Sequence, residues 1–268
     1  MGYGQEYQIK YTLEPVDATA SLLTWASDNP EVISVDKTGK LKVHTTKTAS
    51  AVITASYGPV VQNVTVTVAD GRFWYSLGNG LGNGLDNNWY LDGNNASVVS
   101  SDGNKTTVQM GSGYRGDLWL ARSGKGKIVN VTPADYRYFA IKVGFKSQLV
   151  PGKNKPNGCI KLEIFDDGIK KIGPEYFGTG GDANNRYEIL GASEISTTEP
   201  NVLYYDLQSK YKTVTPTDWN QVFDLVQCKF VIADFPETAQ TYDLYWIRSF
   251  KSIEELQAFV DSENNTNE

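Results

Sequence analysis

Short runs of alternating apolar and polar residues are the feature that most constrains this chain. Residues 64–68 read VTVTV and residues 7–13 read YQIKYTL, so every second side chain would lie on the same face of an extended strand. The chain also contains 16 tyrosines, 6 tryptophans and 25 glycines. Aromatic and β-branched residues at this density, interrupted by Gly, Asn and Asp, predict an all-β chain.

Length and charge narrow the class of protein. A chain of 268 residues is long enough for about two domains. The formal net charge of −6 and the lack of a basic stripe argue against nucleic-acid binding. No apolar run reaches the roughly 18–20 residues of a membrane-spanning helix, and no signal peptide is present. Because polar sequence follows Met1 at once, we expect the native start to be missing from this chain.

The spacing of turns divides the chain into two predicted domains, 1–70 and 71–268. In the first, turn residues at intervals of about 8–12 residues indicate a small β-sandwich. The second contains longer strand candidates separated by turn-rich segments, which favours an antiparallel jelly-roll β-sandwich. A capping box at Ser252–Glu255 predicts a short C-terminal helix over residues 252–261.

The order of residues in the first domain resembles the bacterial Ig-like domain of group 2. That family has a Trp-x-Ser stretch, a Pro-x-Val-x-x-Val segment, a glycine turn and an Ala-x-Ile-x-Ala strand. The matching residues here are Trp25, Ser27, Pro30, Val32, Val35, Gly39, Leu41, Ala51, Ile53 and Ala55. The resemblance covers nearly all of residues 5–69, and it implies a spacer or adhesive module that brings no catalytic residue.

The second domain resembles a different group of proteins. Its last strand, TYDLYWIRSF, is similar to the endings of galactose-binding-like and carbohydrate-binding-module jelly rolls. The closing WIRSFKSIEEL looks like the C-terminal ends of surface proteins from polysaccharide-utilisation systems of Gram-negative gut bacteria. This resemblance implies an extracellular lipoprotein of the outer membrane, anchored through the missing N-terminus, that binds a polysaccharide and hands it to importer partner proteins.

Residue types that carry catalysis are scarce. His44 is the single histidine and lies in the predicted spacer, which argues against a Ser or Cys hydrolase and against a histidine-rich metal site. Glu163, Asp166 and Asp167 lack the spacing of a glycosidase acid pair, and a hairpin turn explains the two aspartates better. Cys159 and Cys228 lie in strand-like runs. This pattern predicts two buried thiols, or a disulfide if the two strands are neighbours. We therefore expect no enzyme activity.

Binding is the function that the residue types favour. Aromatic rings cover the apolar C–H face of a sugar, and Asp, Asn or Arg side chains bond its hydroxyl groups. Trp89 and Tyr90 are the expected stacking residues, because they follow a polar loop, with Trp119, Tyr114 and Tyr187 next. The side chains expected to bond hydroxyl groups are Asp117, Arg115, Asn88 and Arg186.

A tandem repeat, GNGLGNGL over residues 78–85, lies between Trp74 and Trp89. Glycine and asparagine adopt positive φ easily, and the stretch is longer than a hairpin loop needs. We expect a folded loop that brings Trp74 or Trp89 to one rim of the sandwich. No cofactor is expected. A structural calcium ion bound near the repeat stays an open alternative, because Asp86 and Asp92 are carboxylates close to it.

Two other function classes stay open at this point. One is a glycoside hydrolase or lyase with an unrecognised carboxylate pair. The other is a structural or adhesin protein in which every aromatic side chain is packed.

Overall fold

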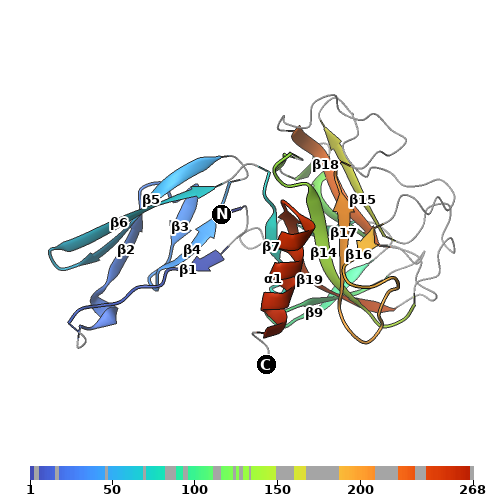
Figure 1. Ribbon diagram of the computed structural model, residues 1–268, viewed down its shortest axis with the longest axis horizontal. Helices are drawn as coiled ribbons and strands as arrows, with labels where there is room; N and C mark the ends of the chain where they lie inside the picture. The colour runs from blue at the N-terminus through green and yellow to red at the C-terminus, as the bar shows by residue number, and fades with distance from the viewer. Residues whose placement is uncertain are drawn as a thin grey trace. The chain divides into compact units, whose positions relative to one another are not determined.

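The computed structural model divides into two compact units, Met1–Trp74 and Tyr75–Glu268. It describes residues 1–2, 6–15, 18–45, 48–68, 71–81, 89–92, 96–110, 116–122, 125–126, 129–132, 134–148, 160–166, 187–208, 223–232 and 240–265. The described residues form antiparallel sheets and one C-terminal α-helix (Figure 1). The prediction of an all-β chain that ends in a short helix is confirmed.

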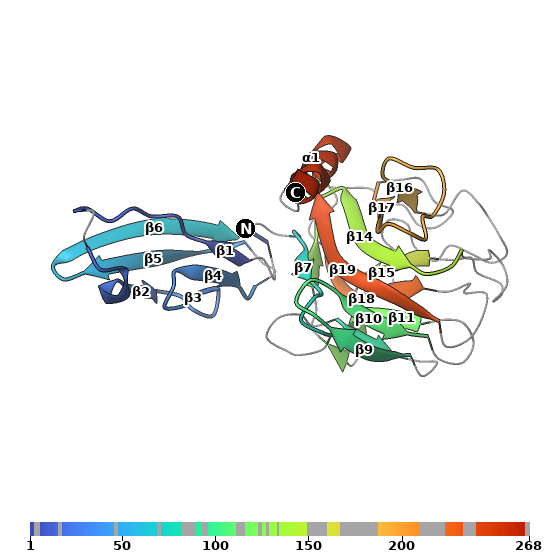
Figure 2. The same cartoon turned by 90° about the horizontal axis from the view of Figure 1, so that it is seen from below.

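The first unit contains two antiparallel sheets. One has the order β1-β4-β3, formed by β1 (Glu6–Gln8), β4 (Lys40–Val43) and β3 (Ile33–Val35). The other has the order β2-β5-β6, formed by β2 (Thr24–Ser27), β5 (Ala49–Tyr57) and β6 (Val60–Val68). A short 3-10 helix, η1 (Ala20–Leu22), precedes β2. The strands β5 and β6 are much longer than the strands of the first sheet (Figure 2).

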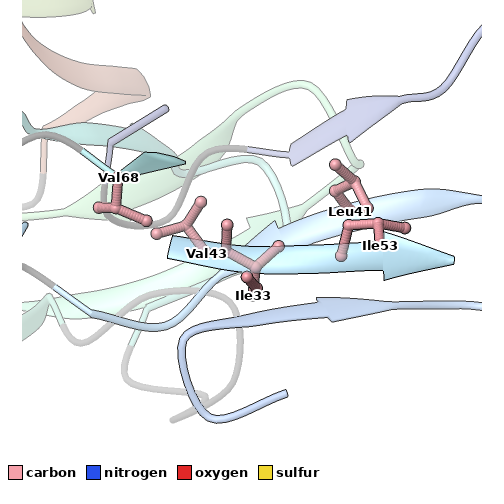
Figure 3. Close-up of a cluster of buried hydrophobic side chains, with 6 residues drawn as sticks. Ile33, Leu41, Val43, Ile53 and Val68 are labelled. Atoms are coloured by element: carbon pink, nitrogen blue, oxygen red, sulfur yellow. The ribbon is translucent and has the colours of Figure 1, made fainter. Parts of the chain in front are cut away.

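Six buried aliphatic side chains form the core of the first unit. They come from both sheets, and Figure 3 shows the cluster: Ile33, Leu41, Val43, Ala51, Ile53 and Val68. Alternate residues of β5 enter this core, as the period-two pattern predicts.

The first strand is shorter than the alternation over residues 7–13 predicts. Gln8 pairs with Lys40, the first residue of β4, so no partner strand continues beyond it. Gly39 precedes Lys40 and has a φ of +82°, which turns the partner chain away from the sheet. The backbone N–H of Ile9 still donates to the Gly39 carbonyl at 3.1 Å, and there the pairing ends.

The second unit contains a first antiparallel sheet that we call the β14 sheet. Its order is β16-β17-β14-β19-β10-β9, and β7 also pairs with β19. The strands are β16 (Glu188–Ile189), β17 (Asn201–Asp206), β14 (Tyr138–Phe145), β19 (Thr241–Phe250), β10 (Thr106–Gln109), β9 (Ser97–Ser101) and β7 (Trp74–Ser76).

The other antiparallel sheet of the second unit is called the β18 sheet here. Its order is β12-β11-β18-β13, with β15 paired to β18 and β8 paired to β11. The strands are β12 (Lys125–Gly126), β11 (Gly116–Arg122), β18 (Phe223–Ile232), β13 (Val129–Val131), β15 (Ile160–Asp166) and β8 (Tyr90–Asp92).

The two sheets pack against each other through aromatic side chains, and Phe230 on β18 is at the centre. Its ring centroid lies 5.7 Å from that of Phe139 on β14 and 5.9 Å from that of Tyr205 on β17. Trp89, just before β8, lies 5.8 Å from it. All four side chains are buried, so the second unit is a β-sandwich with an aromatic core.

The C-terminal helix, α1 (Ile253–Asn265), begins as the sequence predicts and ends four residues later. The Glu255 N–H donates to Ser252 Oγ at 3.2 Å, and the Lys251 N–H donates to Glu255 Oε2 at 2.7 Å. The first bond is the expected cap of Ser252, whereas the return bond of Glu255 reaches Lys251, one residue before the N-cap. On its inner face Leu256 is buried, and Phe259 packs on Trp246 and Phe250 of β19.

The replacement Phe230→Ala tests the aromatic core. We expect it to lower the free energy of unfolding of the second unit by about 3–5 kcal/mol, because it empties a site that both sheets share. Urea unfolding, fitted with a separate transition for each unit, measures this change. The control Val99→Ala removes an exposed side chain and should change the value by less than about 0.5 kcal/mol. Equal effects of the two changes would contradict the assignment.

Gly39 and Gly58 form a matched pair for the first unit. Both have positive φ, but a Cβ at Gly39 would lie 2.7 Å from the Trp25 ring, whereas a Cβ at Gly58 would meet nothing within 4 Å. Gly58→Ala should therefore cost about 1–2 kcal/mol through φ alone. Gly39→Ala should cost at least about 1 kcal/mol more because of the clash. Thermal unfolding of both variants measures the difference, and equal melting temperatures would disprove it.

Candidate functional site

The structure places Trp89 in the core. Its side chain has 0% exposure and lies edge-on to Tyr75 at 5.8 Å, in addition to its contact with Phe230. The prediction that Trp89 is exposed for stacking is therefore wrong, and the glycine repeat does not bring it to a rim. The physical reason is that Trp89 lies next to β8, so its indole completes the space between the two sheets.

Two of the predicted site residues, Tyr90 and Asp117, lie on the outer face of the β18 sheet. Each is next to a fully buried residue, Trp89 or Leu118, and successive residues of a strand alternate between the two faces. Trp119, a third predicted residue, pairs in register with Tyr90 on β8 and with Lys229 on β18. The sequence suggested Tyr90 because it follows a polar loop, whereas the structure places all three residues on paired strands.

Asp117, which the sequence suggested as a partner for sugar hydroxyl groups, is a buried residue. It is 7% exposed, and its Oδ2 lies 3.1 Å from Nζ of Lys229, which is also 7% exposed. Desolvation of two charges offsets much of their attraction, so the pair is weak evidence for stability. The burial of both groups argues against direct contact between Asp117 and a ligand.

The other predicted site residues are distributed differently. Tyr187 is half-buried and lies just before β16. Asn88, Tyr114, Arg115 and Arg186 lie outside the described residues, as do Asp86 and Cys159. Their predicted roles stay predictions.

A polar groove of about 700 Å³ lies on the β14 sheet beside α1. Its lining comes from six places in the second unit: the β9–β10 turn, β14, the segment before β17, β17 itself, β19 and α1. The side chains with binding chemistry are Asn104, Lys142, Glu199, Tyr245, Glu263 and Asn264. A volume of this size lies within the range of ligand pockets in proteins, about 300–1,000 Å³. We take this α1 groove as the candidate site.

A β-bulge in β19 places Tyr245 in the α1 groove. Lys142 pairs with Trp246 and Val143 pairs with Leu244, so Tyr245 is the extra residue between them. Tyr245 and Trp246 therefore both lie on the outer face, although they are consecutive. Trp246 packs under Phe259 of α1, and Tyr245 remains half-buried beside the helix.

The Tyr245 ring lies under a cation. Nζ of Lys142 is 5.6 Å from the ring centroid. Burial raises the pKa of the Tyr245 phenol, so its hydroxyl group stays neutral and can donate a hydrogen bond at neutral pH.

Glu263 links the last turns of α1 to the sheet. Its Oε2 accepts from Lys142 Nζ and from Trp246 Nε1, both at 3.1 Å, and its Oε1 lies 3.5 Å from Nη1 of Arg248. The Arg248 guanidinium also lies 4.3 Å from the centroid of the Phe259 ring. Because three donors from β14 and β19 converge on one carboxylate, the helix wall of the α1 groove is held in place.

Glu199 is positioned by a folded segment. The buried side chain of Asn201 accepts from the Ser196 N–H at 2.7 Å and donates to the Ser196 carbonyl at 2.9 Å. Ser196 Oγ in turn accepts from the Glu199 N–H at 3.1 Å. These local bonds hold the segment before β17 without regular secondary structure.

Gly78, the first glycine of the repeat, contacts the turn that carries the groove residue Asn104. The Gly78 carbonyl accepts from the Gly103 N–H at 3.0 Å, and a Cβ at Gly78 would lie 2.2 Å from the Gly103 oxygen. Asp102 Oδ1 accepts from the N–H groups of Asn104 and Lys105, which shapes the turn that carries Asn104. The first glycine of the repeat is therefore required for a close backbone approach.

A charged cluster around Asp243 lies on the same face of the β14 sheet as Tyr245. The Asp243 side chain is 3% exposed, and its Oδ2 accepts from Lys105 Nζ at 2.8 Å and from Lys146 Nζ at 3.1 Å. Its Oδ1 accepts from Thr107 Oγ1 at 2.7 Å. Burial raises the pKa of Asp243, but the three hydrogen bonds outweigh it and hold the pKa below its usual value.

Two further observations concern sites that the sequence left open. Cys228 is a buried free thiol whose pKa is raised by burial, which makes it unreactive.

Within the described ranges, no group of three or more His, Cys, Asp or Glu side chains could hold a metal ion. In the same ranges, no helix is long and apolar enough to cross a membrane. Asp86 and the side chain of Asp92 lie outside those ranges, so the calcium expectation is untested.

Sequence reasoning missed the α1 groove, although one signal was available. In TYDLYWIRSF the alternation breaks at Leu244-Tyr245-Trp246-Ile247, where four apolar or aromatic residues are consecutive. Such a break marks a bulge, which redirects side chains. Nothing local indicates that Glu199, Lys142 and Glu263 lie around the same groove.

The replacement Asp243→Asn tests the charged cluster. A carboxyl group whose pKa is lower in the folded protein stabilises it above the unfolded pKa, and this stabilisation is lost as the pH falls through the folded pKa. We expect the unfolding free energy of the second unit to fall below about pH 4, and to fall less steeply in Asp243→Asn. Urea unfolding between pH 3 and pH 7 measures both slopes. The exposed Asp135→Asn is the control, and identical slopes for Asp243→Asn and the unmodified chain would refute the assignment.

Two of the solved structures that the chain matches are distant likenesses. One is the S-layer protein SbsC, domains 4 and 5, with 13% identity over 84% of this chain and 77% of that one, at a TM-score of 0.22. The other comprises the CBM51-2 and INT domains of Clostridium perfringens ZmpB, with 12% identity over 85% of this chain and 40% of that one, also at 0.22. At this TM-score neither likeness carries an argument about the second unit or the first. No curated protein matches the chain.

One family model covers most of the second unit. It is described as "Domain of unknown function (DUF4979)" and matches residues 80–256. The matched range contains the α1 groove residues Asn104, Lys142, Glu199 and Tyr245, and it ends within α1. Because the match extends over more than half of the chain, the protein belongs to the DUF4979 family.

Proposed function

We propose that this protein is a non-catalytic glycan-binding protein of the cell surface, and that the α1 groove binds part of a polysaccharide. The observation that carries the proposal is the lining of the groove. One half-buried aromatic ring, Tyr245, lies among amide, carboxylate and ammonium groups in a space of about 700 Å³. An aromatic ring suits the C–H face of a sugar, and the polar groups suit its hydroxyl groups.

Preorganisation supports the same proposal. The groups that line the α1 groove are fixed by the Glu263 contacts, the Asn201 bonds and the Gly78–Gly103 approach. A site that is rigid before binding loses less conformational entropy when a ligand arrives. This property favours recognition of an extended, flexible glycan.

The state of Glu263 favours binding over bond cleavage. Glycoside hydrolysis needs two carboxyl groups, one of which donates a proton. Glu263 instead accepts from Lys142 and Trp246 and lies close to Arg248, and these contacts give it a structural role. This leaves Glu199 as the other carboxylate of the α1 groove, without a second acid to complete a pair among the described lining residues.

The proposal also includes the cellular location and the partner proteins that the sequence resemblance implies. The protein would act outside the cell, as an outer-membrane lipoprotein of a polysaccharide-utilisation system that passes glycan to importer proteins. In this arrangement the first unit, with its likeness to bacterial Ig-like domains of group 2, is the spacer, and the second unit is a carbohydrate-binding jelly roll.

Affinity electrophoresis against a panel of polysaccharides tests the proposal. We expect at least one polysaccharide to retard the chain, and Tyr245→Ala to weaken that binding about tenfold or more through loss of the ring. Tyr138→Ala is the matched control, since Tyr138 is also half-buried on the β14 sheet but does not line the α1 groove.

Other outcomes would contradict specific parts of the proposal. Retained binding in Tyr245→Ala, with loss in Tyr90→Ala, would place the site on the outer face of the β18 sheet. Release of reducing ends from the retarding polysaccharide would show an enzyme. The absence of retardation by every polysaccharide would favour a structural or adhesin protein.

A further inference from the structure

The first unit contains a second hollow, and Trp25, one of its lining residues, also packs against the core cluster. It has a volume of about 360 Å³, and three aromatic side chains line it: Tyr11, Trp25 and Tyr57. Tyr11 is 43% exposed, and the other two are half-buried. The sequence resemblance implies a spacer or adhesive module here and names no ligand site, so this aromatic hollow needs a separate explanation.

The hollow follows from unequal strand lengths. β5 and β6 have nine residues each, whereas β1, β3 and β4 have only three or four. One end of the longer sheet is therefore not covered by the shorter one. Across this end, Trp25 pairs with Ala55 and Ala55 pairs with Gln62, so these three residues form a row on one face. The small side chain of Ala55, between two large ones, leaves the space open.

The rings around the hollow are held in fixed positions. Tyr11 and Trp25 form an edge contact with centroids 5.6 Å apart and planes at 60°. Trp25 also packs so closely against Gly39 that no Cβ fits there. The Tyr57 hydroxyl oxygen accepts from the Thr19 N–H at 3.3 Å. The aromatic walls therefore exist before any ligand binds, which reduces the entropy lost on binding.

The polar side chains at the hollow indicate which ligand it would take. Thr12, Glu14 and Gln62 contribute a hydroxyl, a carboxylate and a carboxamide beside the rings. Of the lining residues that the structure describes, none is Lys or Arg, and the single charge is negative. An anionic ligand such as a phosphate or a uronic acid would lack a counter-charge here. Aromatic faces with neutral and acidic acceptors instead match the C–H face and hydroxyl groups of a sugar ring.

We infer that the aromatic hollow of the first unit is a binding site for a neutral saccharide. The inference goes beyond the proposed function, because it depends only on residues of the first unit and stands whether or not the α1 groove binds glycan. A chain with two saccharide sites would bind a polysaccharide more tightly than either site alone, since the second contact is intramolecular.

Saturation-transfer NMR on the full chain tests the inference. The probes are β-1,4-linked tetrasaccharides of glucose, mannose and galactose, together with tetramethylammonium and a proline-rich decapeptide. The measurements use the Tyr245→Ala chain, so that the α1 groove is weakened and the hollow dominates. We expect at least one neutral tetrasaccharide to receive saturation, and the addition of Tyr11→Ala to weaken this binding about tenfold.

Matched variants separate the hollow from general surface effects. Tyr7→Ala removes a tyrosine of the same unit with 49% exposure that does not line the hollow, and it should leave saccharide binding unchanged. Gln62→Ala removes an exposed amide at the hollow and should weaken binding without affecting the fold, as circular dichroism would verify. Tyr57→Phe keeps the ring and should retain most of the binding.

The possible failures are distinguishable. If Tyr245→Ala abolishes all saccharide binding, the inference is overturned while the proposed function stands. If Tyr245→Ala leaves binding intact and Tyr11→Ala abolishes it, the inference stands and the proposed site in the α1 groove fails. Binding of tetramethylammonium alone, or of the decapeptide alone, would replace the saccharide by a cationic or a peptide ligand and overturn the inference.

Discussion

The contact of Phe230 with Phe139, Tyr205 and Trp89 is the interaction on which the second unit depends. It joins a strand of the β18 sheet to two strands of the β14 sheet and to the segment before β8. The large apolar area that these rings bury holds the two sheets face to face. The outer faces of both sheets are then free to carry polar chemistry. The same contact explains why Trp89, which the sequence suggested for ligand stacking, is a core residue.

On the outer face of the β14 sheet, one bulge organises the α1 groove. By adding Tyr245 to β19, it lets Trp246 anchor α1 while Tyr245 faces the groove beside the helix. The helix in turn contributes Glu263, whose contacts with Lys142 and Trp246 return to the sheet. The bulge in β19, the packing of α1 on the sheet and the lining of the α1 groove therefore depend on one another. Each of the three uses contacts that the other two make.

Much of the fold could be predicted from local patterns, because strand period, turns and helix caps depend on neighbouring residues. The strands over 64–68 and TYDLYWIRSF and the helix cap at Ser252 were predicted in this way. The site was predicted less well. Whether Trp89 points inward or outward depends on register, and the burial of Asp117 depends on Lys229, which is 112 residues away in the chain. Such long-range pairings leave no local signal.

Local sequence patterns alone were enough to predict the all-β class, the terminal helix and the aromatic and polar residue types, since composition and short-range periodicity are properties of the chain. Which residues face a hollow depends on tertiary packing. Glu199, Tyr245 and Glu263 share the α1 groove because three distant segments pack together there. Tyr11, Trp25 and Tyr57 share the aromatic hollow because one sheet is longer than its partner. Packing between elements determines both sites, and no stretch of sequence contains that information on its own.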